Sequence, residues 1–411
     1  MHTDPLPPLG PLSGVRVLDL STVVVGPACS LTLADHGAEV IKIEPPEGDL
    51  MRQLGGSFRH RGMSGKFMNF NRNKRSVCLD LKTPTGRGMM NRLLETSDVF
   101  ITNMRPGALD KLGLDWPSAR AVNPALIHCL VLGFGRGGRY CGRPAYDTVI
   151  QSSAGICGAF EASGSQPRFV PLVMTDHITG LIAAQAIGFA LYRRGRTGRG
   201  ESIEVPMFEN MAAFVLREHM GGMTFEPPIA PPGDPRILNP DNHPVRTQDG
   251  YIAISPNTDE QAFAFFFAIG RPELRSDPRF CSVAARTANS VAYYALRAES
   301  LRGKTSEEWL RIFEELDVPS MRYNSLESLV TDPHLTDVGF LSESEHPSEG
   351  PIRDIGIANR FSEGTRSQVE PAPRLGEHTL AVLRERGVDE TTLRAAAAER
   401  ALFDPSMEQP R

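Results

Sequence analysis

The sequence predicts an α/β protein with a parallel sheet, and three observations lead to this prediction. The first 135 residues alternate short apolar runs with helical stretches, a pattern typical of right-handed βαβ units. A long apolar helical segment follows at Thr175–Arg194. Seven prolines in Phe225–Pro244 then indicate an extended linker, and the pattern of predicted helices and strands differs after it. We therefore expect a large domain and a smaller one.

Five apolar runs are expected to form the strands of the large domain. They are Val15–Leu20, Glu39–Glu44, Ser76–Leu81, Asp98–Thr102 and Leu126–Leu132. Pro27–His36 predicts a helix closed by Gly37, and the helix after the third strand has Pro84 in its first turn, where proline is tolerated. After a glycine-broken turn, Ser202–Val205 predicts one more strand.

The segment Thr175–Arg194 predicts the strongest helix of the chain. It is apolar over much of its surface, so we expect it to be buried. Thr175 or Asp176 is expected to be its N-cap, and the arginines at its other end suit the negative pole of the helix.

Beyond the linker the sequence predicts a mixed helix and strand domain. Thr247–Ser255 suggests a hairpin with a turn at Asp249–Gly250, and helices are expected at Asp259–Ile269 and Thr305–Leu316. The second of these helices opens with a capping box formed by Thr305 and Glu308. Gly376–Gly387 is expected to be a final docking helix, followed by a loose tail after Pro405.

Composition excludes several classes of protein. The 411 residues allow two or three domains, and the formal charge of −5 argues against a nucleic-acid-binding surface. The apolar runs are too short for a transmembrane helix, and the N-terminus lacks the basic region of a signal peptide. The six cysteines form no C-x-x-C pair, so we expect reduced thiols in a cytoplasmic protein. Because no histidines are paired at ligand spacing, no metal is expected.

Two motifs leave alternatives open. Gly133, Gly135 and Gly138 spell the dinucleotide fingerprint, but no helix follows as that motif requires, so a flexible turn at the carboxyl edge of the sheet is favoured. Open α/β sheets bind ligands at that edge. The run Asn71–Arg75 contains three cations; it predicts a solvated face or, together with Lys82, a small phosphate site.

Asp176 also allows two interpretations. It is suited to cap the helix that begins there, and it is suited to act as a carboxylate nucleophile if a dry pocket strips its hydration shell. The neighbouring His177 and the strand residue His128 are interpreted as structural. The sequence contains no G-x-S-x-G motif and no cysteine with a triad signature.

Taken together, these segments resemble the family III CoA-transferases, a superfamily that includes formyl-CoA transferase, carnitine CoA-transferase and the α-methylacyl-CoA racemases. The matching segments are V-L-D-L-S at 17–21, G-P at 26–27, G-A-E-V-I-K-I-E at 37–44, N-K-R-S-V-C-L-D-L-K at 73–82, N-M-R-P-G-A-L-D-K-L-G at 103–113, G-R-P-A-Y-D at 142–147, T-D-H-I-T-G at 175–180, R-T-G-R-G at 196–200, V-P-M-F-E at 205–209 and L-G-E-H-T at 375–379. They occur in order along nearly the whole chain.

The resemblance implies that Asp176 is the nucleophile, through an aspartyl anhydride and an aspartyl-CoA thioester. It implies CoA contacts at Val24, Val25, Pro45, Leu79, Lys82, Asn103, Met104, Lys111 and Tyr146. Lys82 and Lys111 are expected to meet phosphates, with assistance from Arg105. No permanently bound cofactor is implied, since CoA and acyl-CoA are substrates.

Three departures from formyl-CoA transferase affect the substrate prediction. Val24 replaces a gating glutamine, Pro45 replaces an arginine, and Gly233–Arg236 stands where a glycine-rich flap would be. A formate and oxalate pair is therefore disfavoured. We expect succinyl-CoA as donor and a small dicarboxylic acid as acceptor, with Arg236 as a candidate cation for the second carboxylate.

The same resemblance leaves a racemase as the alternative function. The racemases need a histidine at the position of Tyr146, and tyrosine, with an ordinary pKa of about 10, is a poor substitute for it. A non-catalytic CoA- or nucleotide-binding protein is the third hypothesis. The resemblance also implies a Rossmann-like large domain from residues 1–225 and 331–411, a small α+β domain from 226–330, and an interlocked homodimer.

Overall fold

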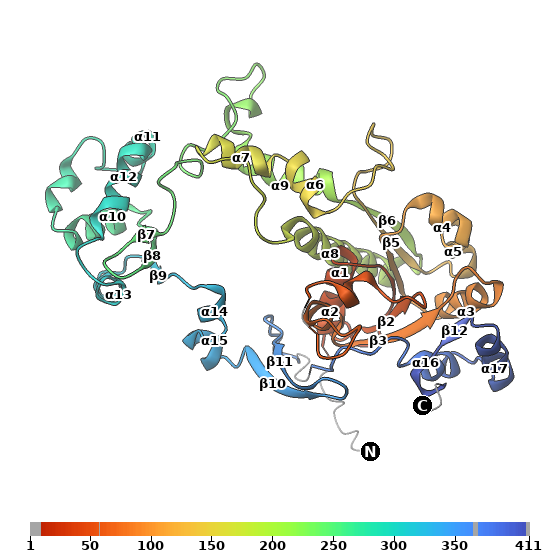
Figure 1. The fold of residues 1–411 in the computed structure, drawn as a ribbon. Helices are drawn as coiled ribbons and strands as arrows, with labels where there is room; N and C mark the ends of the chain where they lie inside the picture. The colour runs from red at the N-terminus through yellow and green to blue at the C-terminus, as the bar shows by residue number, and fades with distance from the viewer. Residues whose placement is uncertain (1–9, 57, 365–368, 408–411) are drawn as a thin grey trace. The chain divides into compact units, whose positions relative to one another are not determined.

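The computed structural model describes residues 10–56, 58–364 and 369–407. The chain forms two compact units (Figure 1). The first comprises the described residues of Met1–Ala154, Val170–Ala212 and Thr336–Arg411, and the second comprises Gly155–Phe169 and Ala213–Leu335. These boundaries differ from the predicted domain boundaries at 225 and 330, which stay a prediction.

The first unit is built on a seven-stranded sheet. Its strands are β1 (Arg16–Leu20), β2 (Glu39–Glu44), β3 (Lys74–Leu79), β4 (Val99–Thr102), β5 (Ile127–Leu132), β6 (Glu201–Pro206) and β12 (Leu402–Phe403). The spatial order is β12-β3-β2-β1-β4-β5-β6, and every neighbouring pair is parallel except β12 with β3. The predicted α/β class with a parallel sheet is thus confirmed. The order 3-2-1-4-5-6 is that of the doubly wound Rossmann fold.

Helices cover both faces of this sheet. In the first unit they are α1 (Val25–Asp35), α2 (Gly65–Asn71), α3 (Pro84–Glu95), α4 (Pro106–Leu112), α5 (Trp116–Val122), α6 (Asp147–Ser153), α8 (Met174–Thr197), α16 (Thr379–Glu385) and α17 (Glu390–Ala398), with short 3₁₀ turns at Leu50–Gln53 and Pro405–Met407. A hairpin of β10 (Leu341–His346) and β11 (Gly350–Ile355) completes the unit.

The alternation of side chains along the strands separates two environments. Leu18, Leu20, Ile41 and Ile43 belong to an apolar cluster with residues of α3, α4, α5, α16 and α17. The alternate residues Asp19 and Lys42 are register partners and so point to the opposite face, where they are fully buried. One face of the sheet is therefore an ordinary apolar core, whereas the other contains buried charges.

The second unit has its own core. It contains α7 (Ile156–Ala162), β7 (Val245–Arg246), β8 (Tyr251–Ile254), β9 (Ser320–Arg322), α10 (Asp259–Ala268), α11 (Val283–Ala288), α12 (Ser290–Ser300), α13 (Ser306–Glu315) and α14 (Leu326–Leu329), while α9 (Met207–His219) and α15 (Pro333–Asp337) cross its boundaries. Short 3₁₀ turns occur at Gly221–Thr224 and Pro272–Ser276. Fully buried phenylalanines of α10 and α13 lie in this core. The predicted hairpin and the Thr305–Glu308 capping box are confirmed.

Two expectations about the charged run and the long helix are wrong. Within the run Asn71–Arg75, residues 71–74 are buried rather than solvated and Arg75 is half-buried. All three cations have carboxylate partners instead of a free phosphate site: Arg72 pairs with Asp35 at 2.7 Å, Lys74 with Asp19 at 3.4 Å and Arg75 with Glu385 at 2.6 Å. The helix α8 is buried on one face only, and Leu181, Phe189 and Tyr192 are exposed on the other. An apolar sequence pattern does not reveal which face of a helix meets a neighbour.

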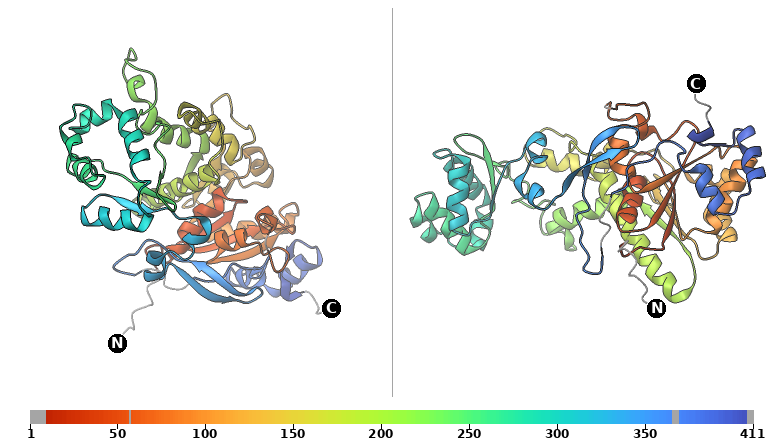
Figure 2. Two further views of the ribbon diagram at one scale, coloured as in Figure 1. Left: turned by 60° about the vertical axis from the view of Figure 1, so that its left-hand side comes forward. Right: turned by 90° about the horizontal axis from the view of Figure 1, so that it is seen from below.

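The C-terminal segment also differs from expectation. The predicted last helix is α16, but the chain continues through α17 and returns to the sheet as β12, which pairs with β3 (Figures 1 and 2). Pro405–Met407 forms a 3₁₀ turn, and the rest of the predicted loose tail lies outside the described residues.

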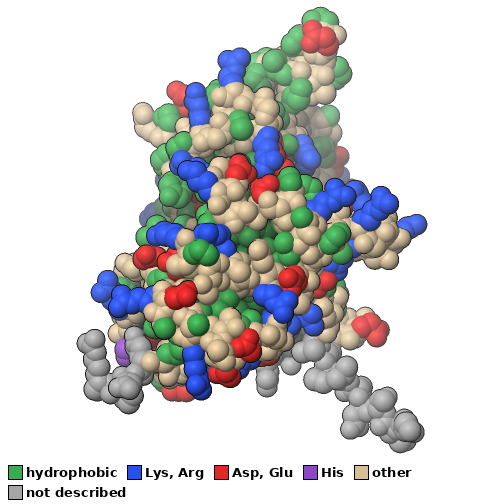
Figure 3. Space-filling view, turned by 90° about the vertical axis from the view of Figure 1, so that its right-hand side faces the viewer, with side chains coloured by type: hydrophobic (Ala, Val, Ile, Leu, Met, Phe, Trp, Pro, Cys, Tyr) green, Lys and Arg blue, Asp and Glu red, His purple; other side chains and the backbone are tan. Residues whose placement is uncertain are grey.

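The surface and cysteines complete the picture of the described chain. Basic and acidic side chains are interspersed on the face drawn in Figure 3. All six cysteines are free, as expected. None of the helices in the described part of the chain has the length and apolar character that a bilayer crossing requires.

Candidate active site

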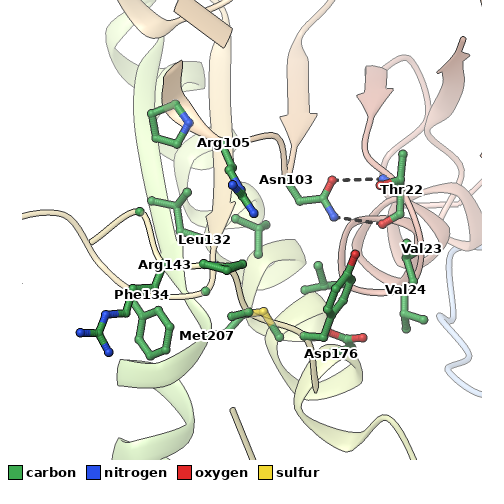
Figure 4. Close-up of a pocket in the computed structure, with 18 of the residues that line it drawn as sticks. Thr22, Val23, Val24, Asn103, Arg105, Leu132, Phe134, Arg143, Asp176 and Met207 are labelled. Atoms are coloured by element: carbon green, nitrogen blue, oxygen red, sulfur yellow. Dashed lines mark hydrogen bonds between the residues drawn. The ribbon is translucent and has the colours of Figure 1, made fainter. Parts of the chain in front are cut away.

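A cavity of about 230 Å³ lies in the first unit at the carboxyl ends of β1, β4 and β5 (Figure 4). Because the chain leaves β1 toward β2 on one side and returns as β4 on the other, this edge is the topological switch point where such sheets bind ligands. The lining residues are Thr22, Val23, Val24, Val25, Asn103, Arg105, Pro106, Val131, Leu132, Gly133, Phe134, Cys141, Gly142, Arg143, Pro144, Ala145, Tyr146, Asp176 and Met207.

Asn103 ties the two loops of the switch point together. Its side-chain amide donates to the carbonyl oxygen of Thr22 at 2.9 Å, and its Oδ1 accepts the Thr22 N–H at 3.1 Å (Figure 4). These paired hydrogen bonds link the segments that follow β1 and β4, as a further pair of hydrogen bonds between the two strands would. Asn103 thus has a local structural role in addition to the CoA contact that the sequence predicts for it.

Asp176 lies in the first turn of α8 and projects into the cavity (Figure 4). Its side chain is only 8% exposed, and its carboxylate forms no hydrogen bond or ion pair within the described part of the chain. Burial, with a smaller contribution from the nearby charge of Asp147, raises the pKa of Asp176 to about 7, against a weaker opposing effect of Lys66. A buried carboxylate without partners is a reactive group.

The carboxylate of Asp147, not that of Asp176, caps α8. Asp147 Oδ1 accepts the backbone N–H of Thr175 at 2.7 Å and that of Asp176 at 3.3 Å. It also accepts the Thr175 hydroxyl at 2.7 Å, and Gln151 donates to the other oxygen of Asp147 at 2.6 Å. The N-cap residue itself is Val173, so the expectation that Thr175 or Asp176 is the cap is wrong. The capping carboxylate comes from α6, which leaves the side chain of Asp176 free.

The close approach of α1 and α8 sets the distance between the two halves of the site. A Cβ at Gly180 would lie 2.8 Å from the carbonyl oxygen of Val25 and 2.9 Å from Cβ of Ala28. Only glycine permits this crossing, one turn after Asp176. The helix that carries Asp176 is therefore packed directly against the turn that carries Val24 and Val25.

The structure brings together six of the predicted site residues. Val24, Val25, Asn103, Arg105, Tyr146 and Asp176 all line the cavity. The other five do not: they are Pro45, Leu79, Lys82, Met104 and Lys111. Pro45 directly follows β2, and Lys82 lies shortly after β3, so both are exposed near the same carboxyl edge. Leu79 is buried in the apolar core, and Met104 packs against it. Lys111 is exposed on α4.

Sequence reasoning missed several residues of the cavity wall. Phe134 and Arg143 come from the loop after β5, and Met207 begins α9. The signal was present, since the glycine motif at 133–138 indicated a turn at the carboxyl edge and the segment 142–147 was among the matched motifs. Arg105 and Arg143 are exposed and add two cations to a wall that is otherwise largely apolar.

The described residues contain no group of three or more His, Cys, Asp or Glu side chains suited to a metal.

Comparison with known proteins identifies the family to which this chain belongs. The family model described as CoA-transferase family III matches residues 12–379. The chain belongs to CoA-transferase family III. This family III enzyme is 30% identical to succinyl-CoA:glutarate CoA-transferase of Mus musculus over 91% of its own length and 86% of the relative. It is 31% identical to succinate–glutarate CoA-transferase of Agrobacterium fabrum, covering 91% of this chain and 95% of the relative.

A solved structure supports the same assignment. The crystal structure of a CAIB/BAIF family protein from Brucella suis matches this family III CoA-transferase with a TM-score of 0.78. The sequences are 32% identical, and the match covers 92% of this chain and 99% of the other. The hypothesis of a non-catalytic binding protein is thereby replaced by that of an enzyme that uses acyl-CoA.

Proposed function

We propose that this enzyme moves CoA from succinyl-CoA to a small dicarboxylic acid through covalent intermediates on Asp176. The observation that carries the proposal is the buried carboxylate of Asp176, free of partners in the cavity at the switch point. Low solvation makes a carboxylate oxygen a better nucleophile toward a thioester carbonyl. The similarity to two succinyl-CoA and glutarate transferases supports the choice of substrates.

The first half of the reaction loads CoA onto the enzyme. An oxygen of Asp176 attacks the thioester carbonyl carbon, and the C–S bond breaks to release CoA thiolate, leaving a mixed anhydride of Asp176 and the acyl group. The thiolate then attacks the aspartyl carbonyl carbon of the anhydride. The donor acid leaves as its carboxylate, and an aspartyl-CoA thioester remains on Asp176.

The second half transfers CoA to the acceptor. The acceptor carboxylate attacks the aspartyl thioester and expels CoA thiolate, which gives a second mixed anhydride. The thiolate attacks the acyl carbon of the acceptor, so the new acyl-CoA leaves and the carboxylate of Asp176 is regenerated. No proton is consumed in the sum of the steps, so no separate general base is required. The steps exchange groups of similar activation, so no nucleoside triphosphate is required.

The other cavity residues have complementary roles in the proposal. Val24, Val25 and Tyr146 form the wall beside Asp176, and Asn103 holds the loop next to them. Lys82, Lys111 and Pro45 are proposed to contact the nucleotide end of CoA, with Leu79 and Met104 supporting that edge. Arg105 and Arg143 are the cations available in the cavity wall for an anionic group of the substrate.

Tyr146 argues against the racemase alternative. Its side chain is 67% exposed and lines the cavity where a second acid or base would be needed. A racemase must remove a proton on one face and return it on the other, and Tyr146 stands at the position where the racemases need a histidine.

The experiment is a mass-spectrometric survey of CoA thioesters in D₂O. The enzyme is incubated with succinyl-CoA or a 2-methylacyl-CoA and a panel of small acids. We expect a new dicarboxylyl-CoA with wild type and none with Asp176→Ala or Asp176→Asn, while CoA binding survives. Deuterium at C2 of the 2-methylacyl-CoA without a new thioester would instead indicate the racemase. Sustained turnover by Asp176→Asn, with deamidation excluded, would refute the role of Asp176.

We also propose that the enzyme is a homodimer, and that it acts in the cytoplasm. The exposed side chains of Leu181, Phe189 and Tyr192 on α8 support the first point, because large apolar side chains gathered on one helix face are typical of an interface. Light scattering coupled to size-exclusion chromatography tests it: a mass near twice the 45.0 kDa of the chain is expected.

A further inference from the structure

The turn between β1 and α1, residues 21–26, contains a residue in an unfavourable conformation. Val23 has a φ of +68°, in the left-handed region that β-branched residues rarely adopt. Val23 also lines the cavity that contains Asp176. A strained residue at a functional site persists only where its surroundings hold it, so the groups that hold Val23 are of interest.

Asp49 holds Val23 directly. Its Oδ1 accepts the backbone N–H of Val23 at 3.1 Å and that of Met51 at 2.9 Å. Its Oδ2 accepts a hydrogen bond from Nζ of Lys42 at 2.8 Å, and neither side chain of this ion pair is exposed at all. Lys42 also donates to the carbonyl oxygen of Ser21 at 2.9 Å. One buried ion pair thus binds the backbone of the turn at two points.

The remaining backbone groups of the turn divide into bound and free. Asp19 accepts the N–H of Ser21 at 3.0 Å, and Asn103 binds both backbone groups of Thr22. By contrast, the N–H groups of Val24, Val25 and Gly26 form no hydrogen bond within the described part of the chain. The turn is fixed up to Val23, and the first free donors come directly after it, at the positive end of α1.

Stability alone does not account for this ion pair. A buried ion pair usually contributes little net stability compared with apolar side chains of the same volume, because both charges lose their hydration. The ion pair does fix the geometry of the turn, because the two Asp49 oxygens and the Lys42 ammonium each need a hydrogen-bond partner at a fixed position. A group that fixes the backbone of a strained cavity residue is suited to a positioning role.

We propose that Asp49, held by Lys42, is a positioning residue of the transfer reaction. Its carboxylate keeps Val23 left-handed and so places the walls and free N–H groups of Val24 and Val25 beside the acyl group bound at Asp176. Asp49 itself does not line the cavity, so it acts through the turn. This inference rests on the proposed function, because it assigns a residue that supports the same reaction.

The test compares Asp49→Asn with a matched control, Asp35→Asn. Asp35 is also buried and ion-paired, with Arg72, but it lies at the far end of α1 and does not contact the turn. Both variants are expected to lower the melting temperature. For Asp49→Asn we expect kcat to fall about 10- to 100-fold with KM for the acyl-CoA changed less than about threefold, since small misplacements of reacting groups cost rates of this order. For Asp35→Asn we expect kcat to stay within about twofold of wild type.

A second variant supplies rescue. Glycine adopts a positive φ without strain, so Val23→Gly placed in the Asp49→Asn background is expected to restore at least about a third of the lost kcat. If Asp49→Asn does not fold, Asp49→Glu keeps the charge while displacing the acceptor oxygen, and the same kcat loss is expected.

The outcomes are distinguishable from those of the proposed function. Wild-type enzyme without CoA transfer would contradict the proposed function itself. Active wild type together with a folded Asp49→Asn of unchanged kcat would overturn the positioning role. Equal kcat losses in Asp49→Asn and Asp35→Asn, without rescue by Val23→Gly, would also overturn it, because they would indicate a general effect of stability.

Discussion

The carboxylate of Asp147 accepts the backbone N–H of Asp176 at 3.3 Å, so two acidic residues meet at the first turn of α8. Asp147 takes over the capping of the helix and leaves Asp176 without a partner. At the same time its charge adds to burial in raising the pKa of Asp176. The same residue therefore frees the proposed nucleophile and adjusts its protonation.

Asp147→Asn is expected to shift the acidic limb of the pH–rate profile to lower pH. In the proposed mechanism Asp176 reacts as the carboxylate, so activity is expected to fall as pH drops through its pKa of about 7. Removing the like charge of Asp147 lowers that pKa, although burial keeps it above the ordinary value. The profile of kcat/KM from pH 5 to 9 measures the shift. Asp98→Asn serves as control, because Asp98 pairs with Arg194 at 2.9 Å, at the opposite end of α8 from Asp176. An acidic limb that stays in place in Asp147→Asn would contradict the coupling.

Asp176→Asn is expected to stabilise the fold at pH 8 while abolishing turnover. The folded-state pKa of about 7 exceeds the ordinary aspartate value of 3.8, so ionised Asp176 costs up to about 4 kcal/mol of unfolding free energy above pH 7. The cost disappears as pH falls below about 4, where both states are protonated. Urea unfolding of wild type and variant at pH 8 and pH 5 measures the difference. Equal differences at both pH values would contradict the raised pKa.

Gly180→Ala is expected to reduce kcat by about 10- to 100-fold. The added methyl group would press on the carbonyl oxygen of Val25, so α8 and the turn before α1 must separate and carry Asp176 away from Val24. Gly158→Ala is the control, because it lies inside another helix, α7, with nothing within 4 Å of its added Cβ. That control should gain about 1 kcal/mol of stability and keep its activity. Steady-state kinetics and thermal melts check both variants.

Arg143→Gln is expected to raise KM for a dicarboxylic acceptor about 10-fold and to change KM for a monocarboxylic acceptor by less than about twofold. Arg143 is one of the residues that line the cavity, and its exposed guanidinium lies 4.8 Å from the ring centroid of Tyr140 with no ion-pair partner within the described residues, so it can receive a second carboxylate. Arg139→Gln, in the same loop but outside the cavity wall, is the control. If both acceptors weaken equally, Arg143 binds a part of the substrate that the two acids share.

Much of the fold follows from local sequence patterns. Four of the five predicted strands of the large domain agree with the structure to within one residue, and the third begins and ends two residues earlier than predicted, at Lys74–Leu79. The capping box at Thr305 is local as well, because both partners lie three residues apart. Such features depend on the spacing of neighbouring residues, which a sequence displays directly.

The site was predicted less completely, and the particular errors show why. Arg72 and Lys74 were predicted to be solvated because their partners, Asp35 and Asp19, are 37 and 55 positions away in the sequence. Asp176 was predicted to cap α8 because the residue that has this role in the structure, Asp147, lies on another helix. Pairing at this separation is set by how helices and strands pack, which no local pattern encodes.

The sequence by itself determined the parallel α/β architecture and the family of the enzyme, and it selected Asp176 as the candidate nucleophile, because periodicity, turn residues and matched motifs are properties of the chain order. Only the tertiary structure decided which carboxylate caps α8, which cations are internal and which residues surround Asp176. These depend on burial and on contacts between distant segments, and burial is what raises the pKa of Asp176 to about 7. A charge acquires its chemistry from its surroundings, and those exist only once the chain is folded.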